Sequence, residues 1–507
     1  MNLLSERPEK QTPGYWCTWS TQNFGRKEPE PIQLRDHEGP RSAMLARAWL
    51  NEEVLFGTAE QSGWVDFLPQ ARSDLFLLLD DGWDVSHDIE RQRQEFGCMI
   101  LSEENFPSFS GSPQEKLLRL NEKIKAAGWR GAGLWIACQE APLYTESEGM
   151  EAYWRKRAQW CRYAGIEYWK IDWGTHEHDA AYRAKITQIA AEVYPALTVE
   201  HACPMGPFNG RQAGMPGSER FAAEKELCEA ALQMAGEARV YRSYDVTAQL
   251  SVPTTLDRLS VLLAQPGGLV NCEDELSIGA ALGCTLGIMR APTWNRLPGM
   301  DYMPYGQTRK MDEATRAVRW QRCAPAFAAG GLTVSEDCLT DRWLFAAGDS
   351  WESERVGQTV RQTAPAVMAR GMKLPDVQAA GGERPYVVCG KNPNGAVAVA
   401  ALHRVDTAGR SFYMPEAEVT LHLDEMPPLI GVFGVYRSLR LCLPRLTENA
   451  RVYAQDLLAD EAQDITAAVK REGKELLLPG ELLQKIGLSH ASPGDFSAPG
   501  LALAIRQ

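Results

Sequence analysis

The 507-residue sequence predicts an α/β protein, a (β/α)8 TIM barrel followed by a small C-terminal antiparallel β-sandwich. Strand-like and helix-like segments alternate eight times, which is typical of parallel βαβ units. The strand-like segments at 74–79 and 131–138 are almost continuously apolar, as a sheet buried on both faces requires. After about residue 380, short strand-like segments separated by Gly, Pro and Asn are typical of a sandwich. We therefore expect a catalytic barrel over 1–375 and a sandwich domain over 376–507.

The expected elements follow the chain in a regular order. The barrel strands are predicted at 14–19, 74–79, 131–138, 167–174, 197–201, 240–246, 268–274 and 331–335. The 3.6-residue spacing of apolar side chains predicts the helices between them, at 44–56, 113–127, 151–163, 179–194, 219–236, 254–264 and 312–328. The segment 276–310 has an apolar half and a half rich in Pro and Gly, and its pattern assigns no single element.

Composition limits the class of protein. The formal charge of −13 argues against nucleic acid as the main partner, because phosphate binding needs a basic surface. The 12 cysteines are scattered without a C-x-x-C pair, the first residues contain no hydrophobic signal region, and no apolar run is long enough for a membrane helix. We expect a cytoplasmic protein without a membrane partner, and the sequence leaves the oligomeric state open, a homo-oligomer included.

The central expected strand carries a lysine and an aspartate at its end. Lys170 and Asp172 are two residues apart, so their side chains point to the same side of a strand. The carboxyl ends of the strands are where a TIM barrel keeps its catalytic groups. A structural ion pair that caps the strand is the alternative interpretation.

Acidic residues end six successive expected strands, from the second to the seventh. They are Asp80 and Asp81, Glu140, Asp172, Glu200, Asp245, and Glu273 and Asp274. A single acid at such a place is commonly a helix cap or a turn residue. A rim crowded with carboxylates, with tryptophans and a lysine nearby and no metal-ligand spacing, suits a sugar, because carboxylates accept hydroxyl hydrogen bonds and aromatic rings pack on C–H faces. Glycoside hydrolysis needs two carboxylates, and Lys170 would keep Asp172 ionised as a nucleophile. No cofactor or metal is implied.

Four motifs resemble, in order, the α-galactosidase clan (glycoside hydrolase families 27 and 36). They are LDDGW at 79–83, Phe106 with Pro107, YWKID at 168–172 and RSYD at 242–245. The resemblance covers about residues 13–345, and the early start of the barrel is more similar to family 27. It implies a retaining exo-glycosidase that hydrolyses terminal α-linked galactose or a close relative.

The resemblance also implies roles for individual residues. Asp172 would be the nucleophile and Asp245 the acid/base. Asp80 and Asp81 would bind the sugar's 4- and 6-hydroxyls, and Lys170 would also touch the sugar. The remaining expected contacts are Trp16 or Trp19 in the pocket floor, Trp135, Glu200 and Arg242.

The sequence departs from the family pattern at two places. Family 27 commonly has an arginine four residues before its acid, whereas Arg242 is three before Asp245, so Glu273, Asp274 and Glu200 are the alternatives for this role. The loop that reads the sugar's 2-substituent begins with 200–204 (EHACP), which leaves galactose and N-acetylgalactosamine both open, and a small Ala202 would admit an acetamido group. An α-N-acetylgalactosaminidase and a catalytically silent sugar-binding barrel are therefore the rival interpretations.

Overall fold

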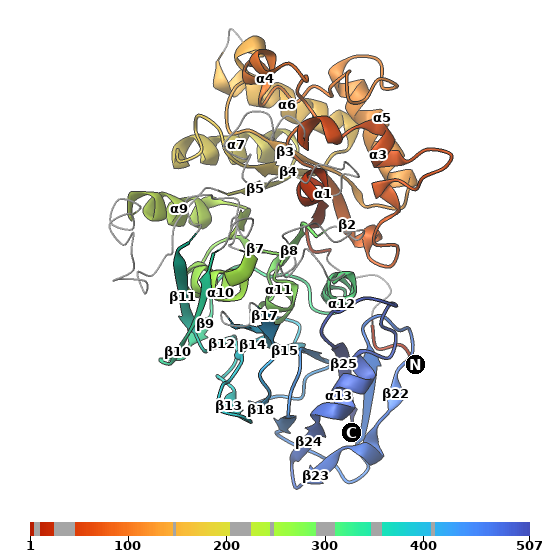
Figure 1. Ribbon diagram of the computed structural model, residues 1–507, viewed down its shortest axis with the longest axis vertical. Helices are drawn as coiled ribbons and strands as arrows, with labels where there is room; N and C mark the ends of the chain where they lie inside the picture. Colours follow the sequence, from red (N-terminus) through yellow and green to blue (C-terminus); the bar gives the residue numbers. More distant parts are fainter. Residues whose placement is uncertain are drawn as a thin grey trace.

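A closed eight-stranded barrel forms the N-terminal part of the chain. The computed structural model describes residues 1–4, 11–24, 46–145, 149–202, 225–243, 248–290, 310–345, 357–406 and 411–507. All neighbouring barrel strands are parallel, and β1 pairs with β8 to close the sheet (Figure 1). The strands are β1 (Gly14–Cys17), β2 (Leu75–Leu79), β3 (Gly131–Ile136), β4 (Tyr168–Ile171), β5 (Thr198–His201), β6 (Val240–Arg242), β7 (Leu269–Glu273) and β8 (Thr285–Ile288). The predicted TIM barrel is confirmed.

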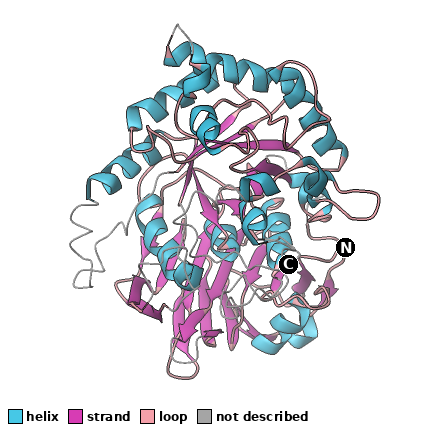
Figure 2. Cartoon of the chain, turned by 45° about the horizontal axis from the view of Figure 1, so that its top comes forward, coloured by secondary structure: helices cyan, strands magenta, loops and turns pink. Residues whose placement is uncertain are grey.

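Helices surround the barrel strands (Figure 2). Local sequence explains several of their ends: Ser112 and Glu115 form a capping box before α5, and Gly165 ends α6 in the left-handed conformation with φ 67°. The helices of this part are α1 (Trp19–Phe24), α3 (Glu52–Phe56), α4 (Ile89–Glu95), α5 (Pro113–Ala126), α6 (Met150–Ala164), α7 (Ala180–Val193), α9 (Lys225–Glu237), α10 (Ser251–Leu262), α11 (Leu276–Leu282) and α12 (Met311–Gln321). Short 3-10 turns lie at η2 (Trp64–Asp66), η3 (Arg72–Asp74), η4 (Pro142–Tyr144) and η5 (Ala248–Leu250).

The eighth barrel strand lies in the segment that the sequence pattern left unassigned. β8 follows the seven-residue helix α11 after a single left-handed turn at Gly283. The expected eighth strand at 331–335 is wrong, because β9 (Leu332–Val334) pairs with β12 (Val367–Arg370) in a C-terminal sheet. The connection from β7 to β8 contains little besides α11. Residues 276–288 therefore form one largely apolar segment, in which the sequence pattern does not mark the boundary between helix and strand.

The C-terminal part contains two sheets packed face to face. Apolar side chains from both sheets, such as Val399 and Leu439, form one buried cluster between them. An 8-stranded sheet has the order β22-β21-β25-β19-β15-β14-β12-β9, and a 5-stranded sheet has the order β13-β18-β20-β24-β23. The strands not yet bounded are β13 (Asp376–Ala379), β14 (Tyr386–Lys391), β15 (Val397–Leu402), β18 (Ala417–His422), β19 (Ile430–Phe433), β20 (Ser438–Cys442), β21 (Arg451–Asp456), β22 (Gln463–Asp464), β23 (Lys470–Glu472), β24 (Glu475–Pro479) and β25 (Gly500–Arg506).

Smaller elements complete this part, which is a sandwich with mixed strand directions. Most neighbouring strands are antiparallel, whereas β12 with β14, β15 with β19, and β18 with β20 are parallel. The remaining elements are the antiparallel pairs β10 (Cys338–Leu344) with β11 (Thr359–Pro365) and β16 (Arg404–Asp406) with β17 (Ser411–Tyr413), the 3-10 turn η7 (Thr466–Ala468) and α13 (Gly480–Gly487). The division at residue 375 stays a proposal, and β9 and β12 before it already belong to the 8-stranded sheet.

Two apolar clusters show which side chains face the barrel axis. Tyr15, Cys17, Trp135 and Tyr168 belong to a small buried cluster of alternate strand residues. Their strand neighbours, such as Trp169, belong to the large cluster between strands and helices. The period of two along each strand therefore directs one set of side chains inward and the other outward. The inward set leads to the polar network described next.

Candidate active site

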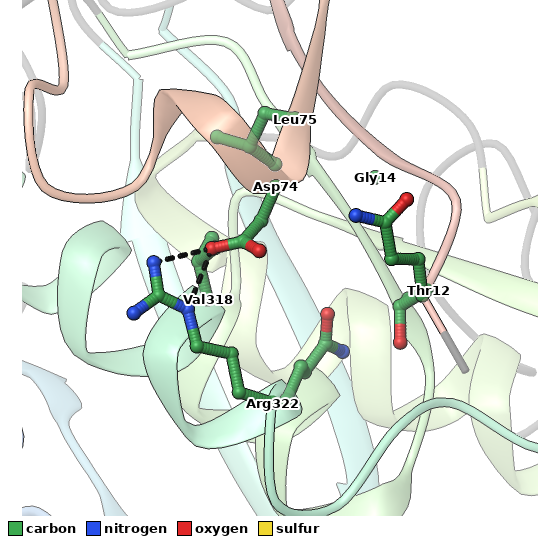
Figure 3. A pocket seen from close by; sticks show the side chains of 8 residues that line it. Thr12, Gly14, Asp74, Leu75, Val318 and Arg322 are labelled. Carbon is green, nitrogen blue, oxygen red and sulfur yellow. Dashed lines mark hydrogen bonds and ion pairs between the residues drawn. The ribbon is translucent and has the colours of Figure 1, made fainter. Parts of the chain in front are cut away.

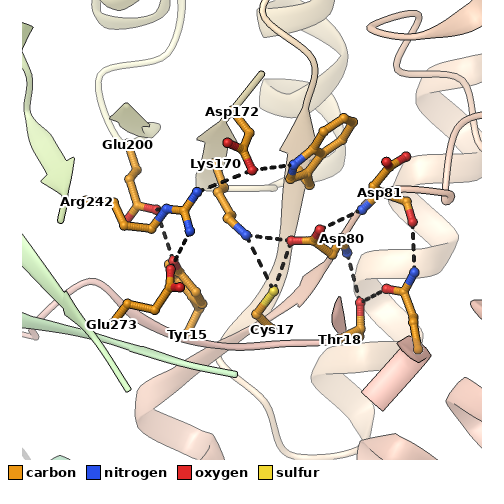
Figure 4. A network of polar contacts seen from close by, with 12 residues as sticks. Tyr15, Cys17, Thr18, Asp80, Asp81, Lys170, Asp172, Glu200, Arg242 and Glu273 are labelled. Atoms are coloured by element: carbon orange, nitrogen blue, oxygen red, sulfur yellow. Dashed lines mark hydrogen bonds and ion pairs between the residues drawn. The ribbon is translucent and has the colours of Figure 1, made fainter. Parts of the chain in front are cut away.

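Charged side chains from five strands meet inside the carboxyl end of the barrel (Figure 4). The network contains Asp80, Lys170, Asp172, Glu200, Arg242 and Glu273. In the sheet register, Lys170 is paired with Trp135 on β3 and with Glu200 on β5, so these side chains lie at one level. The barrel thus brings together most of the residues that the sequence singled out.

Asp80 and Lys170 form a buried ion pair. Lys170 Nζ lies 2.7 Å from Asp80 Oδ2, and the Cys17 thiol donates a hydrogen bond to the same oxygen over 3.0 Å. The Asp80 backbone N–H donates to Thr18 Oγ1. Burial lowers the pKa of Lys170, but Asp80 and Cys17 raise it, and the net pKa lies above the usual value. The ammonium therefore stays charged beside Asp172.

Asp81 is held by an arginine from outside the barrel. Arg47 Nε and Nη2 donate to the two Asp81 carboxylate oxygens over 2.9 and 2.8 Å. Burial raises the pKa of Asp81, against the opposing effect of Arg47. Arg47 follows the segment 25–45, whose structure is not described, and no sequence pattern pointed to it.

The Asp172 carboxylate has two unequal oxygens. Oδ2 accepts a hydrogen bond from Trp135 Nε1 over 3.0 Å and lies 3.2 Å from Arg242 Nη2. Oδ1 is buried and has no hydrogen-bond partner among the described residues. Burial would raise the pKa of Asp172, but Arg242, Lys170 and Trp135 lower it, and the net pKa lies below the usual value. The site therefore holds an ionised carboxylate with one oxygen fixed and the other unengaged.

The Arg242 guanidinium connects three carboxylates. Besides Asp172, it contacts Glu273 through Nη1 and lies 3.7 Å from Glu200 Oε1 through Nε. Arg242 is 0% exposed. The buried guanidinium lies among three carboxylates, so its charge can hold these acids in place.

The buried Glu200 carboxylate accepts hydrogen bonds from three protein side chains. The donors are Tyr15 Oη over 3.0 Å, Tyr168 Oη over 2.7 Å and Asn271 Nδ2 over 2.6 Å. Burial raises the pKa of Glu200, and Arg242 opposes this effect. A side chain so fully engaged acts as a support for Arg242.

The three candidate tryptophans have different surroundings. Trp135 contacts Asp172, and its ring lies 5.3 Å from the Trp173 ring between centroids. Trp19, at the start of α1, is partly buried and packs against the inward cluster to which Trp135 belongs. Trp16 points outward from β1 into the core around Phe67 and Trp129. Trp16 is therefore not among the residues that the structure brings to the site, because the alternation along β1 directs Tyr15 and Cys17 inward instead.

Among the described acids that the sequence singled out, Asp274 lies apart from the ion pairs of this network. Asp245 lies outside the described residues. Asp274 adopts φ 57° and accepts from the Met289 backbone N–H over 2.9 Å, and Arg290 lies 3.8 Å from its Oδ1. Burial raises the pKa of Asp274 to about 7. Ala202 directly follows β5, two positions after Glu200, so continued alternation assigns it to the same side as Glu200.

Other features of the described residues do not add to this site. They contain no group of three or more His, Cys, Asp or Glu side chains that could hold a metal ion. None of the helices that the structure describes is both long and apolar enough to cross a membrane. A small pocket near Gly14, Leu75 and the Asp74–Arg322 ion pair lies at the amino ends of β1 and β2, opposite the acid cluster (Figure 3).

Comparisons with known proteins give matches in structure alone. No family model and no curated protein matches the chain. It is similar to a glycoside hydrolase family 27 β-L-arabinopyranosidase from Geobacillus stearothermophilus, with 10% identity, a TM-score of 0.40, and 98% of this chain and 97% of that chain covered.

Two further solved structures carry names from the same clan. One is named as a candidate α-galactosidase/melibiase from Bacteroides fragilis, with 12% identity, a TM-score of 0.36, and 98% and 79% of the two chains covered. The other is named as a candidate α-N-acetylgalactosaminidase from Bacillus halodurans, with 9% identity, a TM-score of 0.38, and 99% and 100% covered. At these identities and TM-scores these names carry no argument about activity, which is argued from the side chains.

Proposed function

We propose that the protein is a retaining exo-glycosidase that hydrolyses terminal α-linked galactose, or a closely related sugar, through a covalent glycosyl-aspartate intermediate. The observation that carries the proposal is the state of Asp172. Its carboxylate is ionised by Arg242 and Lys170, its Oδ2 is fixed by Trp135, and its Oδ1 has no partner among the described residues. An activated carboxylate with a free oxygen, at the carboxyl end of a TIM barrel, is what a nucleophile requires.

In the first step, Asp172 Oδ1 forms a bond to the anomeric carbon while the bond from that carbon to the leaving oxygen breaks. Asp245 donates a proton to the leaving oxygen. In the second step, Asp245 takes a proton from water, the water oxygen bonds to the anomeric carbon, and Asp172 departs. Retention requires the two carboxyl groups to lie about 5–5.5 Å apart.

The sugar contacts follow from the groups around Asp172. We propose that Asp80 and Asp81 accept hydrogen bonds from the 4- and 6-hydroxyls and that Lys170 donates to the sugar through the N–H groups that Asp80 does not use. The Asp80–Lys170 contact supports this role, because it fixes both groups at the same level as Trp135. Trp135 and Trp19 are proposed to pack against the sugar ring.

An α-N-acetylgalactosaminidase is the second candidate. It is favoured by Ala202, a small residue directly after β5 that would leave room for an acetamido group. Assay of the aryl α-galactoside and the aryl α-N-acetylgalactosaminide side by side separates the two.

The described cysteines are free thiols, most of them buried, which supports a proposed cytoplasmic, reducing location.

The direct test of the function is Asp172→Ala with an aryl α-glycoside. The variant should fold as the parent does but lose turnover. A variant with full activity would refute the role of Asp172. Sugar binding by the parent without any turnover would favour the catalytically silent barrel.

A further inference from the structure

Arg183 is a buried arginine on α7 that holds the backbone carrying Asp172. Its side chain is 1% exposed. Nη2 donates to the backbone carbonyl of Asp172 over 2.6 Å, and Nη1 donates to that of Ile171 over 3.2 Å. Nε donates to the carbonyl of Glu177 over 2.8 Å. One guanidinium thus joins the end of β4 to the loop that follows it.

The guanidinium of Arg183 also contacts the imidazole ring of His201. Arg183 Nη1 lies 3.3 Å from His201 Nδ1, and a guanidinium can only donate, so Nδ1 is the acceptor. The ring proton therefore lies on Nε2, which donates to Thr187 Oγ1 over 2.7 Å. Thr187 Oγ1 in turn donates to the Arg183 carbonyl over 3.2 Å. Burial and the charge of Arg183 lower the pKa of His201, so this ring is neutral.

No counterion of Arg183 lies in the part of the chain that the structure describes. Its polar partners there are carbonyl oxygens and the neutral ring of His201. Burial of a charge without a counterion is costly, and here the hydrogen bonds to carbonyl oxygens offset part of that cost. Burial is the largest influence on the pKa of Asp172 and raises it. Arg242, Lys170 and Trp135 lower this pKa, and the positive charge of Arg183 lowers it further.

We propose that Arg183 is a positioning residue for the nucleophile, which fixes the backbone of Asp172 and adds a positive charge behind its carboxylate. The inference rests on the proposed function of Asp172. The other charged or titratable groups around Asp172 belong to several elements and stay unchanged in the test. They are Cys17 on β1, Asp80 and Asp81 after β2, Cys138 after β3, Lys170 on β4, Glu200 on β5, Arg242 on β6 and Glu273 on β7.

The test compares Arg183→Lys, which keeps the charge but not the fork of donors, with Arg183→Gln, which keeps amide donors but not the charge. Arg157→Gln is the matched control, since Arg157 is equally buried on α6 and packs on the Tyr153 ring away from the site. Folding is checked by thermal unfolding, and kcat and kcat/KM are measured against pH with an aryl α-galactoside.

Both Arg183 variants should lose kcat, by up to about 10²-fold, because a small displacement of a reacting group is costly. The acid limb of kcat/KM should move to higher pH in Arg183→Gln, since the loss of a nearby cation raises the pKa of Asp172. It should stay in place in Arg183→Lys and in the control. An unmoved limb in Arg183→Gln, or an equal shift in Arg157→Gln, would overturn the proposal.

If Arg183→Gln does not fold, Arg183→Lys decides, and a kcat equal to that of the parent would overturn the proposal. Failure of the proposed function looks different, because Asp172→Ala would then keep its activity. An inactive Asp172→Ala together with unchanged Arg183 variants would reject only the role of Arg183.

Discussion

The indole nitrogen of Trp135 donates a hydrogen bond to Oδ2 of Asp172 over 3.0 Å, and this contact makes the two carboxylate oxygens different. Oδ2 is committed to Trp135 and Arg242, whereas Oδ1 has no partner in the part of the chain that the structure describes. A nucleophile needs both conditions, because the fixed oxygen orients the carboxylate and the free one forms the bond. Trp135 on β3, Arg242 on β6 and Asp172 directly after β4 form this arrangement.

Trp135→Phe should therefore weaken catalysis without removing the nucleophile. A hydrogen bond to a charged group contributes about 1.5–3 kcal/mol, so its loss should lower kcat by about 10-fold or more. The acid limb of kcat/KM should move to higher pH, because Trp135 helps to lower the pKa of Asp172. Trp154→Phe, which removes an indole donor to Tyr182 on the outer helices, is the control. An unchanged pH profile in Trp135→Phe would contradict this account.

Arg242→Met should destabilise the fold as well as abolish activity. Removal of one partner from a buried ion pair costs about 3–5 kcal/mol, and Arg242 has three carboxylate partners. Arg242 lowers the pKa values of Asp172 and Glu200, and its removal should raise both. The loss of unfolding free energy should therefore be greater at pH 8 than at pH 5. Urea unfolding at both pH values measures this difference. Arg242→Lys should recover part of the stability, and an equal loss at both pH values would argue against a charge network.

Asp80 and Lys170 should be energetically coupled in substrate binding. Asp80→Asn and Lys170→Met should each raise KM, and the double variant should be less impaired than the sum predicts, by about 0.5–3 kcal/mol of coupling. The reason is that Lys170 Nζ and Asp80 Oδ2 are 2.7 Å apart and orient each other. Steady-state kinetics of the four proteins give the coupling energy. Strict additivity would show that the pair does not act as one unit.

Asp274 should make stability fall as the pH rises. Burial raises its pKa to about 7, so between the unfolded value near 4 and that folded value the native state binds more protons than the unfolded state. The contribution of Asp274 to the unfolding free energy is then fully present below a pH of about 4. It declines as the pH rises toward 7, by as much as about 4 kcal/mol. Asp274→Asn should flatten this part of the curve, measured by urea unfolding from pH 4 to 8. A curve with the same slope in both proteins would rule out this source.

The alternation of helix-like and strand-like segments was enough to predict the barrel, and the period of two along a strand gave the common direction of Lys170 and Asp172. The same period of two could have found Tyr15, Tyr168 and Asn271, because each is two or four positions from an inward residue on its strand. Arg47 and Arg183 gave no signal, since they reach the site from outside the barrel and only the tertiary fold brings them there. The misplaced eighth strand has a local cause: Gly283 allows α11 and β8 to follow each other with no polar linker.

The most direct measurement is the site of covalent attachment of the sugar. A galactosyl donor with fluorine beside the anomeric carbon should glycosylate the nucleophile with departure of its activated leaving group. The glycosyl-enzyme should then hydrolyse slowly, because fluorine destabilises the positively charged transition state. Trypsin cleavage after Lys170 and Arg183 gives peptide 171–183, which contains Asp172, and fragmentation by mass spectrometry locates the added mass. We predict one fluorinated sugar on Asp172, and attachment to another carboxylate such as Glu273, or turnover of the parent galactoside with no adduct, would contradict the account.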